Sequence, residues 1–458
     1  MFEEFRHVHI IGVGGIGTSA IAKLFLAKGA RVTGSDRQAS ALTDELVRHG
    51  LRFAEGGDPS ALATADLVVY SAAVPDTDPE RAEAARLGVR QLSYPQFLGE
   101  LSRGYTTIAV AGTNGKSTVT AMLGLLLEAA GYDPLVIVGS LVPGFSDGNL
   151  RLGAGRFLVV EACEYRAHML NLHPEMIVLT NVEEDHLDYF RDLAHIQDTF
   201  QTFLDKMKGK GLVVLNADDP GSAGFHADRV VRYGTQDGAD YMVENRRTAA
   251  GIQSALVRRL HPPEPLGDLA LRVPGAFNIM NALAATAAAM ELGVPFETCA
   301  RVLKQFPGIW RRFERVGTWN GADVISDYGH HPTAIRATVA AAREFFPGRR
   351  VVLCFQPHQH ARTKELFGGF VEALAEADAV VVPEVYEVAG RTEDDAHVSS
   401  QQLADAVKKR RPATDVRYAA DLRDARAMLS IVARPGDVIL VQGAGDVDAL
   451  ARGLVGDR

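Results

Sequence analysis

Two glycine-rich loops, each between a short apolar run and a helical pattern, constrain the fold of this 458-residue chain most strongly. The first loop is Gly12-Val13-Gly14-Gly15-Ile16-Gly17 and the second is Ala111-Gly112-Thr113-Asn114-Gly115-Lys116-Ser117. A strand, a glycine loop and a helix form the unit of parallel α/β sheets in which backbone N–H groups hold a phosphate. Two such units predict two phosphate-binding sheets in one chain.

The first loop follows an expected strand at Val8–Ile11 and opens an expected helix at Ile16–Ala27, which Gly29 ends. The chain then resumes as a strand from Arg31 to about Asp36. A G-x-G-x-x-G pattern with an acid about twenty residues later is typical of dinucleotide sites, where the acid binds a ribose. By itself the loop leaves two alternatives open, an NAD-dependent dehydrogenase and a tight turn without a ligand.

The second loop lies between an expected strand at Thr106–Ala111 and a helix at Ser117–Ala130. It resembles a P-loop, in which N–H groups and the lysine hold phosphates while the serine hydroxyl binds Mg²⁺. The match is incomplete, because Val110 stands at the first glycine position, so a chance loop stays an alternative. The expected ATP-binding residues here are Gly112, Thr113, Asn114, Gly115, Lys116, Ser117 and Thr118.

Two further strands end in groups that suit a divalent ion. Glu161 ends Phe157–Glu161, and the sequence from Thr180 to His186 follows Met176–Thr180. Ligands of parallel sheets bind at the carboxyl ends of strands, and Mg²⁺ needs few protein oxygens when phosphate and water complete its shell. The expected metal-binding residues are Ser117, Glu161 and His186. The alternatives are an ordinary surface acid and a histidine that caps a strand.

The last third of the chain carries three further motifs. Arg311-Arg312-Phe313-Glu314 offers guanidinium groups that suit a phosphoryl group, or else a surface pair. Asp327-Tyr328-Gly329-His330-His331-Pro332 follows the expected strand Ala322–Ser326, and Phe355 to Thr363, with His358, Gln359, His360 and Arg362, follows Val351–Phe355. Recognition of a carboxylate and a nucleotide is favoured over zinc, which needs an arranged set of three or four ligands.

Restarts of the strand–helix pattern predict an α/β fold of three consecutive domains, at residues 1–104, 105–317 and 318–458. Turn residues between Tyr233 and Val273 indicate hairpins, and Asn278–Leu292 reads as a helix. The basic run Lys408–Arg411 is expected to be a solvated helix end. Other expected strands are Leu67–Ser71, Leu212–Leu215, Ala379–Val382 and Val438–Val441.

Composition excludes several classes of protein. Asp plus Glu exceeds Lys plus Arg by 57 to 48, a net charge of −9, which argues against a nucleic-acid binder. The scattered Cys163, Cys299 and Cys354 form neither a disulfide framework nor a zinc pattern. Neither a signal peptide nor a span of about 18 apolar residues is present. We therefore expect a cytoplasmic protein with no nucleic-acid partner and no membrane insertion.

Eight motifs in order resemble a Mur ligase over essentially the whole chain: GVGGIG, GTNGKS, EACEY, TNVEEDH, FNIMNALAA, RRFE, DYGHHP and FQPHQHART. The resemblance implies an ATP-dependent amino-acid ligase of peptidoglycan synthesis. It also implies an N-terminal Rossmann-like UDP-binding domain, a central P-loop ATPase-like domain and a C-terminal Rossmann-like domain. The branch that joins L-alanine to UDP-N-acetylmuramic acid is favoured, because no lysine lies between His186 and Lys206 and no D-N-P-R motif occurs.

The resemblance assigns roles to individual residues. Lys116 and Ser117 would hold ATP and Mg²⁺. Glu161 and His186 would bind the metal. Asn278 and Asn281 would lie near adenine. Arg312 would approach the transferred phosphate. Asp327 and Tyr328 would contact the nucleotide. The amino acid would be bound by Tyr328, His330, His358 and Arg362. The UDP-sugar would contact Gly12, Gly14, Gly15, Ile16, Gly17, Asp36 and Ser71. The implied catalytic residues are Lys116, Glu161, His186, Arg312, His330 and His358, with His330 or His358 as the general base.

Departures from the family pattern keep some alternatives open. The usual Glu-Ala-Asp-Glu-Ser-Asp reads Glu161-Ala162-Cys163-Glu164-Tyr165-Arg166, and Gln359 and His360 replace residues that are usually Arg and Tyr. A recycling ligase that joins a preformed peptide to UDP-N-acetylmuramic acid, a non-enzymatic ATP-binding regulator and a dehydrogenase are the rival functions. Oligomeric state is left open between monomer and homodimer.

Overall fold

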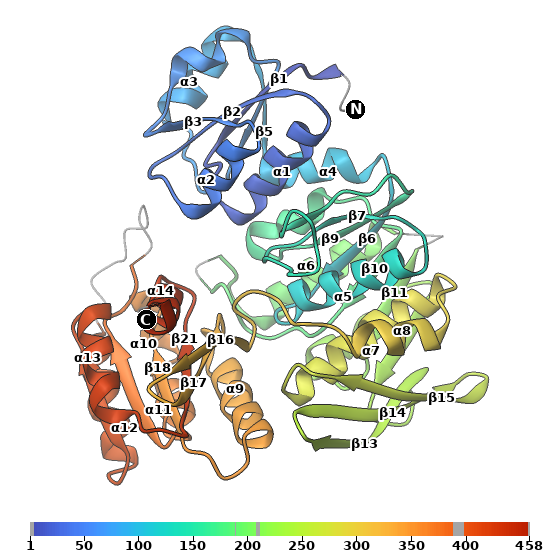
Figure 1. Ribbon diagram of the computed structural model, residues 1–458. Helices are drawn as coiled ribbons and strands as arrows, with labels where there is room; N and C mark the ends of the chain where they lie inside the picture. The colour runs from blue at the N-terminus through green and yellow to red at the C-terminus, as the bar shows by residue number, and fades with distance from the viewer. Residues whose placement is uncertain (1–3, 188, 208–210, 388–397, 457–458) are drawn as a thin grey trace. The chain divides into compact units, whose positions relative to one another are not determined.

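The computed structural model describes residues 4–187, 189–207, 211–387 and 398–456 (Figure 1). It contains three sheets, of five, ten and six strands. The chain divides into two compact units, which we describe separately. One unit comprises Met1–Glu244, Leu256–Leu269 and Met280–Leu303, and the other comprises Asn245–Ala255, Ala270–Ile279 and Lys304–Arg458.

The first sheet has the strand order β3-β2-β1-β4-β5, and its strand pairs are parallel. The strands are β1 (His7–Ile11), β2 (Arg31–Asp36), β3 (Arg52–Glu55), β4 (Leu67–Tyr70) and β5 (Arg90–Ser93). Its helices are α1 (Ile16–Ala27), α2 (Ala41–Arg48), η2 (Pro59–Thr64), α3 (Pro79–Leu87) and α4 (Tyr94–Ser102). The order reverses beside β1, which makes the carboxyl end of β1 the expected ligand position.

The second sheet has the order β15-β14-β13-β12-β11-β10-β6-β9-β7-β8. Its first strands in the chain are β6 (Thr106–Ala111), β7 (Leu135–Ile137), β8 (Leu150–Arg151), β9 (Phe157–Glu161) and β10 (Met176–Leu179). They are followed by β11 (Leu212–Asn216), β12 (Val230–Gly234), β13 (Tyr241–Ala249), β14 (Ile252–Leu260) and β15 (Pro263–Leu271). Because β6 pairs in parallel with both β9 and β10, the loops after these three strands meet at one edge.

Helices of the central region follow the same alternation. They are α5 (Lys116–Ala129), η3 (Tyr165–Asn171), α6 (Leu193–Asp205), η4 (Pro220–Ser222), α7 (Ala276–Glu291) and α8 (Phe296–Leu303). One hydrophobic cluster extends from the first sheet into the second. It includes Phe25 and Phe97, whose ring centroids are 5.5 Å apart, together with Leu158 and Phe200. Each such buried side chain contributes roughly 1.5–3 kcal/mol, so this cluster holds the two sheets in one body.

The third sheet has the order β16-β17-β21-β18-β19-β20. Its strands are β16 (Glu314–Trp319), β17 (Ala322–Asp327), β18 (Val351–Phe355), β19 (Ala379–Pro383), β20 (Asp415–Ala419) and β21 (Val438–Gln442). Among the described strands of this sheet, the edge pair β16–β17 is antiparallel and the other pairs are parallel. The helices are α9 (Pro332–Phe345), α10 (His360–Glu365), α11 (Phe367–Leu374), α12 (Ser400–Arg410), α13 (Leu422–Val432) and α14 (Val447–Gly456).

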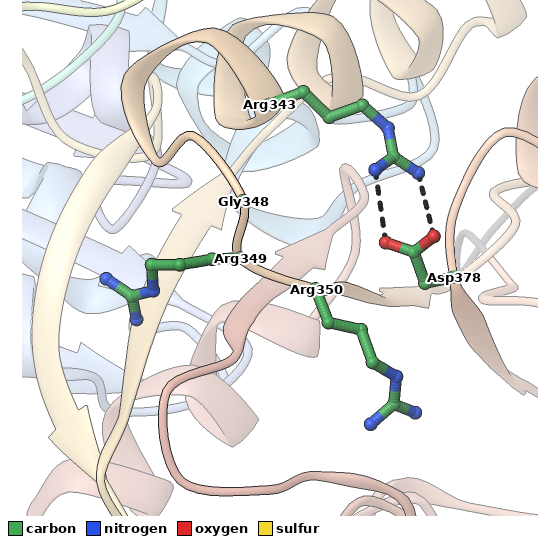
Figure 2. A pocket seen from close by; sticks show the side chains of 5 residues that line it. All are labelled: Arg343, Gly348, Arg349, Arg350 and Asp378. Atoms are coloured by element: carbon green, nitrogen blue, oxygen red, sulfur yellow. Dashed lines mark hydrogen bonds and ion pairs between the residues drawn. The ribbon is translucent and has the colours of Figure 1, made fainter.

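The amino ends of β18 and β19 form a surface pocket lined by Arg343, Gly348, Arg349, Arg350 and Asp378 (Figure 2). Arg343 donates two hydrogen bonds of 3.1 Å to Asp378, Arg349 donates one of 2.6 Å to Asp323, and Arg350 donates one of 3.1 Å to Asp437. Because each guanidinium already has a carboxylate partner, the pocket offers little attraction to an anion. These pairs fasten the strand ends, opposite the edge where the sequence motifs lie.

The fold confirms the predicted three-sheet α/β architecture. The basic run lies at the end of α12, where the exposed Lys408 and Lys409 occupy the last turn, as expected. The domain limits stay a prediction. The third sheet does include β16, which starts at Glu314 and pairs with β17 across the expected limit at residue 317.

Candidate functional site

The first glycine loop leaves β1 in a conformation that only a residue without a side chain fits easily. Gly12 has a φ of 76°, and a Cβ there would lie 2.9 Å from the Cβ of Ser71. The N–H of Gly14 donates a 2.8 Å hydrogen bond to Asp36. The structure therefore brings Asp36 and Ser71 against the loop, and their role in binding a UDP-sugar stays a prediction.

The start of α1 is open to a ligand. Gly15 is its N-cap and forms no side-chain cap, so the first N–H groups keep the partial positive charge of a helix start. Gly17, in the first turn of α1, is needed for close packing. A Cβ at Gly17 would lie 2.6 Å from Cζ of Tyr94, which begins α4, so this glycine lets α4 pack against α1.

The second loop turns through two left-handed glycines, Gly112 with φ 128° and Gly115 with φ 87°. The segment after β10 holds it: the N–H of Thr113 donates to the carbonyl of Asn181 (2.8 Å), and the Thr180 hydroxyl donates to the carbonyl of Asn114 (2.6 Å). Helix α5 starts at Lys116 without a side-chain cap. The N–H groups of Thr113 and Asn114 are thus both bonded to Asn181, which holds the predicted P-loop in one conformation.

The two predicted adenine residues lie one turn apart on α7 but differ in surroundings. A Cβ on Gly115 would lie 2.5 Å from Oδ1 of Asn281, which places that amide directly against the P-loop. Asn278 is buried and donates a 2.6 Å hydrogen bond to the carbonyl of Pro274. Asn281 is therefore brought to the loop, whereas the hydrogen bond from Asn278 to Pro274 fixes the start of its own helix.

Lys116 is held by a carboxylate that the sequence analysis did not assign to the site. Its Nζ lies 3.0 Å from Oε1 and 2.9 Å from Oε2 of Glu164, and it also donates to the carbonyls of Gly112 and Thr113. Glu164 is only 3% exposed. Burial is the largest influence and alone would lower the pKa of Lys116, but the neighbouring acidic groups, with Glu164 foremost, together raise that pKa.

Glu164 also faces His186, whose Nε2 lies 3.8 Å from Oε1 of the carboxylate. His186 has a φ of 54°, a region that non-glycine residues rarely adopt, and its ring packs 4.7 Å from that of Tyr165. The structure thus brings Lys116 and His186 to one carboxylate. The signal for it was present, because Glu164 lies in the third family motif quoted above.

Glu161 ends β9 at the same edge, and its Oε1 accepts a 2.6 Å hydrogen bond from the N–H of Gly139. Ser117 lies in the first turn of α5 and is buried. Among residues 4–187, 189–207, 211–387 and 398–456, no three His, Cys, Asp or Glu side chains gather as a metal-binding group. The predicted metal set therefore consists of separate donors around the P-loop.

In the second unit, the arginine pair packs on Tyr328 at the carboxyl end of β17. The guanidinium carbons of Arg311 and Arg312 lie 5.0 and 4.9 Å from the centroid of its ring. Arg311 is buried and donates to the carbonyls of Gly443 and Gly445, so it is a structural residue, whereas Arg312 is only partly buried. Arg311 is therefore not part of an exposed surface pair, which was the alternative interpretation of this motif.

Asp327 is a buried carboxylate that organises this edge. It accepts hydrogen bonds of 2.8 Å from the N–H groups of Phe313 and Gly329. Burial raises its pKa, although Arg312 and these N–H groups oppose the shift. The segment before β16 is thereby tied to the end of β17, which sets the position of Arg312.

A row of aromatic rings crosses the ends of β17 and β18. Ring centroids are 5.4 Å apart for Tyr328 and His330, 5.9 Å for His330 and His358, and 5.6 Å for His358 and Tyr386. Tyr386 stacks on His358 at 15°. Sequence reasoning missed Tyr386, which follows β19 and lies in none of the quoted motifs.

Two other residues of these motifs, Gln359 and His331, take part in hydrogen bonds that hold the backbone. Gln359 has a φ of 69° and donates from its N–H to the carbonyl of Tyr386 (3.1 Å). His331 is the N-cap of α9, where it accepts from the N–H of Thr333 (3.3 Å). Arg362 lies on α10, one turn after Gln359.

No helix of the described chain is long and apolar enough to cross a membrane.

Comparison with known proteins agrees with this arrangement. Residues 7–106 match the description "Mur ligase family, catalytic domain", 110–289 match "Mur ligase middle domain", and 311–445 match "Mur ligase, glutamate ligase domain". A UDP-N-acetylmuramate–L-alanine ligase of Salinibacter ruber is 41% identical over 449 residues, covering 97% of this chain and 93% of the relative. One of Sorangium cellulosum is 39% identical over 458 residues, covering 98% and 96%.

Solved structures give the same result. The UDP-N-acetylmuramate–alanine ligase of Thermotoga maritima superposes with a TM-score of 0.84 at 28% identity, covering 98% of both chains. A murein peptide ligase of Psychrobacter arcticus has a TM-score of 0.72 at 24% identity over the same share of each chain, which supports the fold alone. Matches to all three parts of the family, in order and over nearly the whole length, leave one conclusion: the chain belongs to the Mur ligase family.

Proposed function

We propose that this protein joins L-alanine to the lactyl carboxylate of UDP-N-acetylmuramic acid, converting ATP to ADP and phosphate. The observation that carries the proposal is the preformed P-loop, with Lys116 held at the start of α5 beside Glu164. The open start of α1 at the end of β1, in the same compact unit, supports a second phosphate-bearing substrate. The names of relatives that cover nearly the whole chain support alanine as the amino acid.

The first step is phosphoryl transfer. A lactyl carboxylate oxygen forms a bond to the γ-phosphorus while the bond between that phosphorus and the bridging oxygen to the β-phosphate breaks, giving an acyl phosphate and ADP. Such transfer depends on positioning and on stabilising charge at the equatorial oxygens. Lys116 supplies one charge when its Nζ turns from Glu164 to the phosphates, and Arg312 supplies a second.

The second step is attack by the neutral amine of alanine on the acyl carbon. The tetrahedral intermediate then loses phosphate as the carbon–oxygen bond breaks, and the amine proton passes to a base. His358 and His330 are the proposed bases, because imidazole is the usual general base in enzymes and both rings lie at the edge where Arg362 could bind the alanine carboxylate. Tyr386 keeps the His358 ring in place by stacking.

Mg²⁺ fits the donor set around the P-loop. The Ser117 hydroxyl and the Glu161 carboxylate are hard oxygen ligands, and His186 stands at the same edge. A phosphate-bound Mg²⁺ keeps several waters and needs only one or two such groups. When bound there, the ion would neutralise charge on the transferring phosphate.

We further propose a cytoplasmic protein, since its nucleotide substrates are intracellular compounds. The glycine loop residues with Asp36 and Ser71 would bind the UDP-sugar, and Asn281 would lie nearest the adenine.

The test is phosphate release from ATP and Mg²⁺ with UDP-N-acetylmuramic acid, with each amino acid and the L-alanyl tripeptide of peptidoglycan offered separately. Release with L-alanine, and a product heavier by one alanyl residue, is expected. Release with the tripeptide alone would replace the proposal by a recycling ligase. ATP binding without release in any mixture would support a regulator, and NAD-dependent absorbance changes would support a dehydrogenase.

A further inference from the structure

Asn149 lies on the loop between β7 and β8, outside every motif quoted above, yet its side chain is fully buried. Its Nδ2 donates to the carbonyl of Ile16 and to the hydroxyl of Ser19 (2.8 Å), and its Oδ1 accepts from Nζ of Lys23 (3.1 Å). All three partners belong to α1. One amide of the central sheet's loop therefore holds the first two turns of the helix that follows the glycine loop.

Lys23 makes this attachment rigid. Its side chain is only 2% exposed, and besides Asn149 it bonds the carbonyl of Asp147 (2.7 Å) and the carboxylate of Glu45 (2.8 Å). A buried ammonium group is costly unless its hydrogens are satisfied. The loop at 147–149 is therefore a required partner of α1 and not an incidental contact.

The other end of the same loop reaches the phosphate-transfer edge. The N–H of Val138 donates to the carbonyl of Asn149 (3.0 Å), and the next N–H, of Gly139, donates to Glu161 (2.6 Å). Asn149 thus connects α1, through one backbone bond and one residue of chain, to the carboxylate proposed to bind Mg²⁺. These contacts all lie within one compact unit.

We infer that Asn149 is a positioning residue, which sets the start of the UDP-sugar-binding helix relative to the Glu161 edge. The inference rests on the proposed function. Transfer requires the lactyl carboxylate to approach the γ-phosphate to about 3–3.5 Å, and an error of about 1 Å can cost about 100-fold in rate. A shift of α1 would carry the sugar away from the phosphate while leaving the glycine loop able to bind it.

Two variants separate positioning from stability. Asn149→Ala removes the whole contact, whereas Asn149→Asp keeps an acceptor for Lys23 but cannot donate to the carbonyl of Ile16. Ser146→Ala, at an exposed position on the same loop, is the matched control. Each variant is compared with the wild type by thermal unfolding, by calorimetric binding of UDP-N-acetylmuramic acid without ATP, and by steady-state ligation.

We expect kcat to fall about 10- to 100-fold in both Asn149 variants, with the dissociation constant for UDP-N-acetylmuramic acid changed less than about threefold. Asn149→Asp should unfold closer to the wild-type temperature than Asn149→Ala, yet remain slow. Wild-type kcat in Asn149→Asp would reduce the residue to a stabilising role and overturn the inference. Should Asn149→Ala fail to fold, the Asp variant alone decides. An inactive wild type would overturn the proposed function, and this inference with it.

Discussion

The ammonium group of Lys116 lies 3.0 Å from the carboxylate of Glu164, at the first residue of α5. In this arrangement the cation that is proposed to meet the phosphates is held in place by a buried acid before any nucleotide arrives. The same acid faces His186, 3.8 Å away. The sequence named the lysine and the histidine, and the structure supplies the group that joins them.

Replacing Lys116 by Ala should lower kcat for ligation by about 100- to 1,000-fold, because the positive charge that stabilises the transferring phosphate is lost. Lys28→Ala, at an exposed lysine at the end of α1, is the control. Phosphate release with all substrates present measures the effect. Near-normal release by Lys116→Ala would overturn the P-loop assignment.

Replacing Glu164 by Gln should shift the pH dependence of the reaction. Burial lowers the pKa of Lys116, and the charge of Glu164 is the largest of the influences that together raise this pKa above its ordinary value. Without that charge burial dominates, the pKa falls, and the loss of activity at alkaline pH should begin at a lower pH. A rate profile from neutral to alkaline pH checks this, with Glu83→Gln, at an exposed ion pair, as the control. An unchanged alkaline limb would contradict the role given to Glu164.

Replacing Gly17 by Ala should weaken binding of the UDP-sugar by about tenfold or more. The new methyl group would lie 2.6 Å from Cζ of Tyr94, so the Tyr94 ring or the start of α1 would have to move. Gly368→Ala on α11 is a suitable control, because nothing lies within 4 Å of its added Cβ. Titration calorimetry with UDP-N-acetylmuramic acid measures the effect. Equal affinities of the Gly17 variant and wild type would argue against a site at the start of α1.

Replacing Tyr386 by Ala should raise the KM for L-alanine several-fold while leaving the KM for ATP nearly unchanged. The ring of Tyr386 stacks on His358 at 5.6 Å, and its loss frees the imidazole to adopt other rotamers. Tyr386→Phe keeps the ring and should restore the KM. A parallel rise in both KM values would indicate general damage to the third sheet instead.

Replacing Glu80 by Gln should make the free energy of unfolding change less with pH in the acid range. Burial opposes ionisation of Glu80, yet hydrogen bonds from His9, Ser35 and the N–H of Asp58 hold its pKa below the ordinary value. Such a group stabilises the fold above its unfolded pKa, near 4.5, and this contribution disappears as pH falls through the lower folded pKa.

The Glu80 variant should therefore lose about 1.5–3 kcal/mol of unfolding free energy at pH 7, the usual contribution of hydrogen bonds to a charged group, and less below pH about 4. Urea unfolding at several pH values measures it. Glu83→Gln, on the same helix but only partly buried and paired with the exposed Arg86, should differ little from wild type. A constant difference between wild type and Glu80→Gln at all pH values would contradict this account.

The bounds of helices and strands were predicted well where the local sequence is apolar enough to require burial. The helix Ile16–Ala27 and the strand Thr106–Ala111 have the predicted bounds, because an apolar strand, a glycine loop and an apolar helix leave little freedom. The edge strands β3 and β5 were missed, since Arg52–Glu55 and Arg90–Ser93 are largely polar and are strands only because a neighbour pairs with them.

The same distinction separates the site residues. Lys116 and Glu161 are recognisable because their chemistry lies in a local pattern. Tyr386 and Asn149 act through partners far away in sequence, a stacked ring and a helix more than one hundred residues earlier. Tertiary contacts of this kind leave no periodic or motif signal, so only the structure reveals them. The roles in substrate binding stay predictions until the variants above are measured.

The most direct test of the acyl phosphate route follows one oxygen atom. UDP-N-acetylmuramic acid labelled with ¹⁸O in both lactyl carboxylate oxygens is converted with ATP, Mg²⁺ and L-alanine, and the released phosphate is analysed by mass spectrometry. The account predicts one ¹⁸O atom in each phosphate and one in the new amide. Unlabelled phosphate would contradict it, whether the alanylated product forms with the second ¹⁸O released into water or no alanylated product forms.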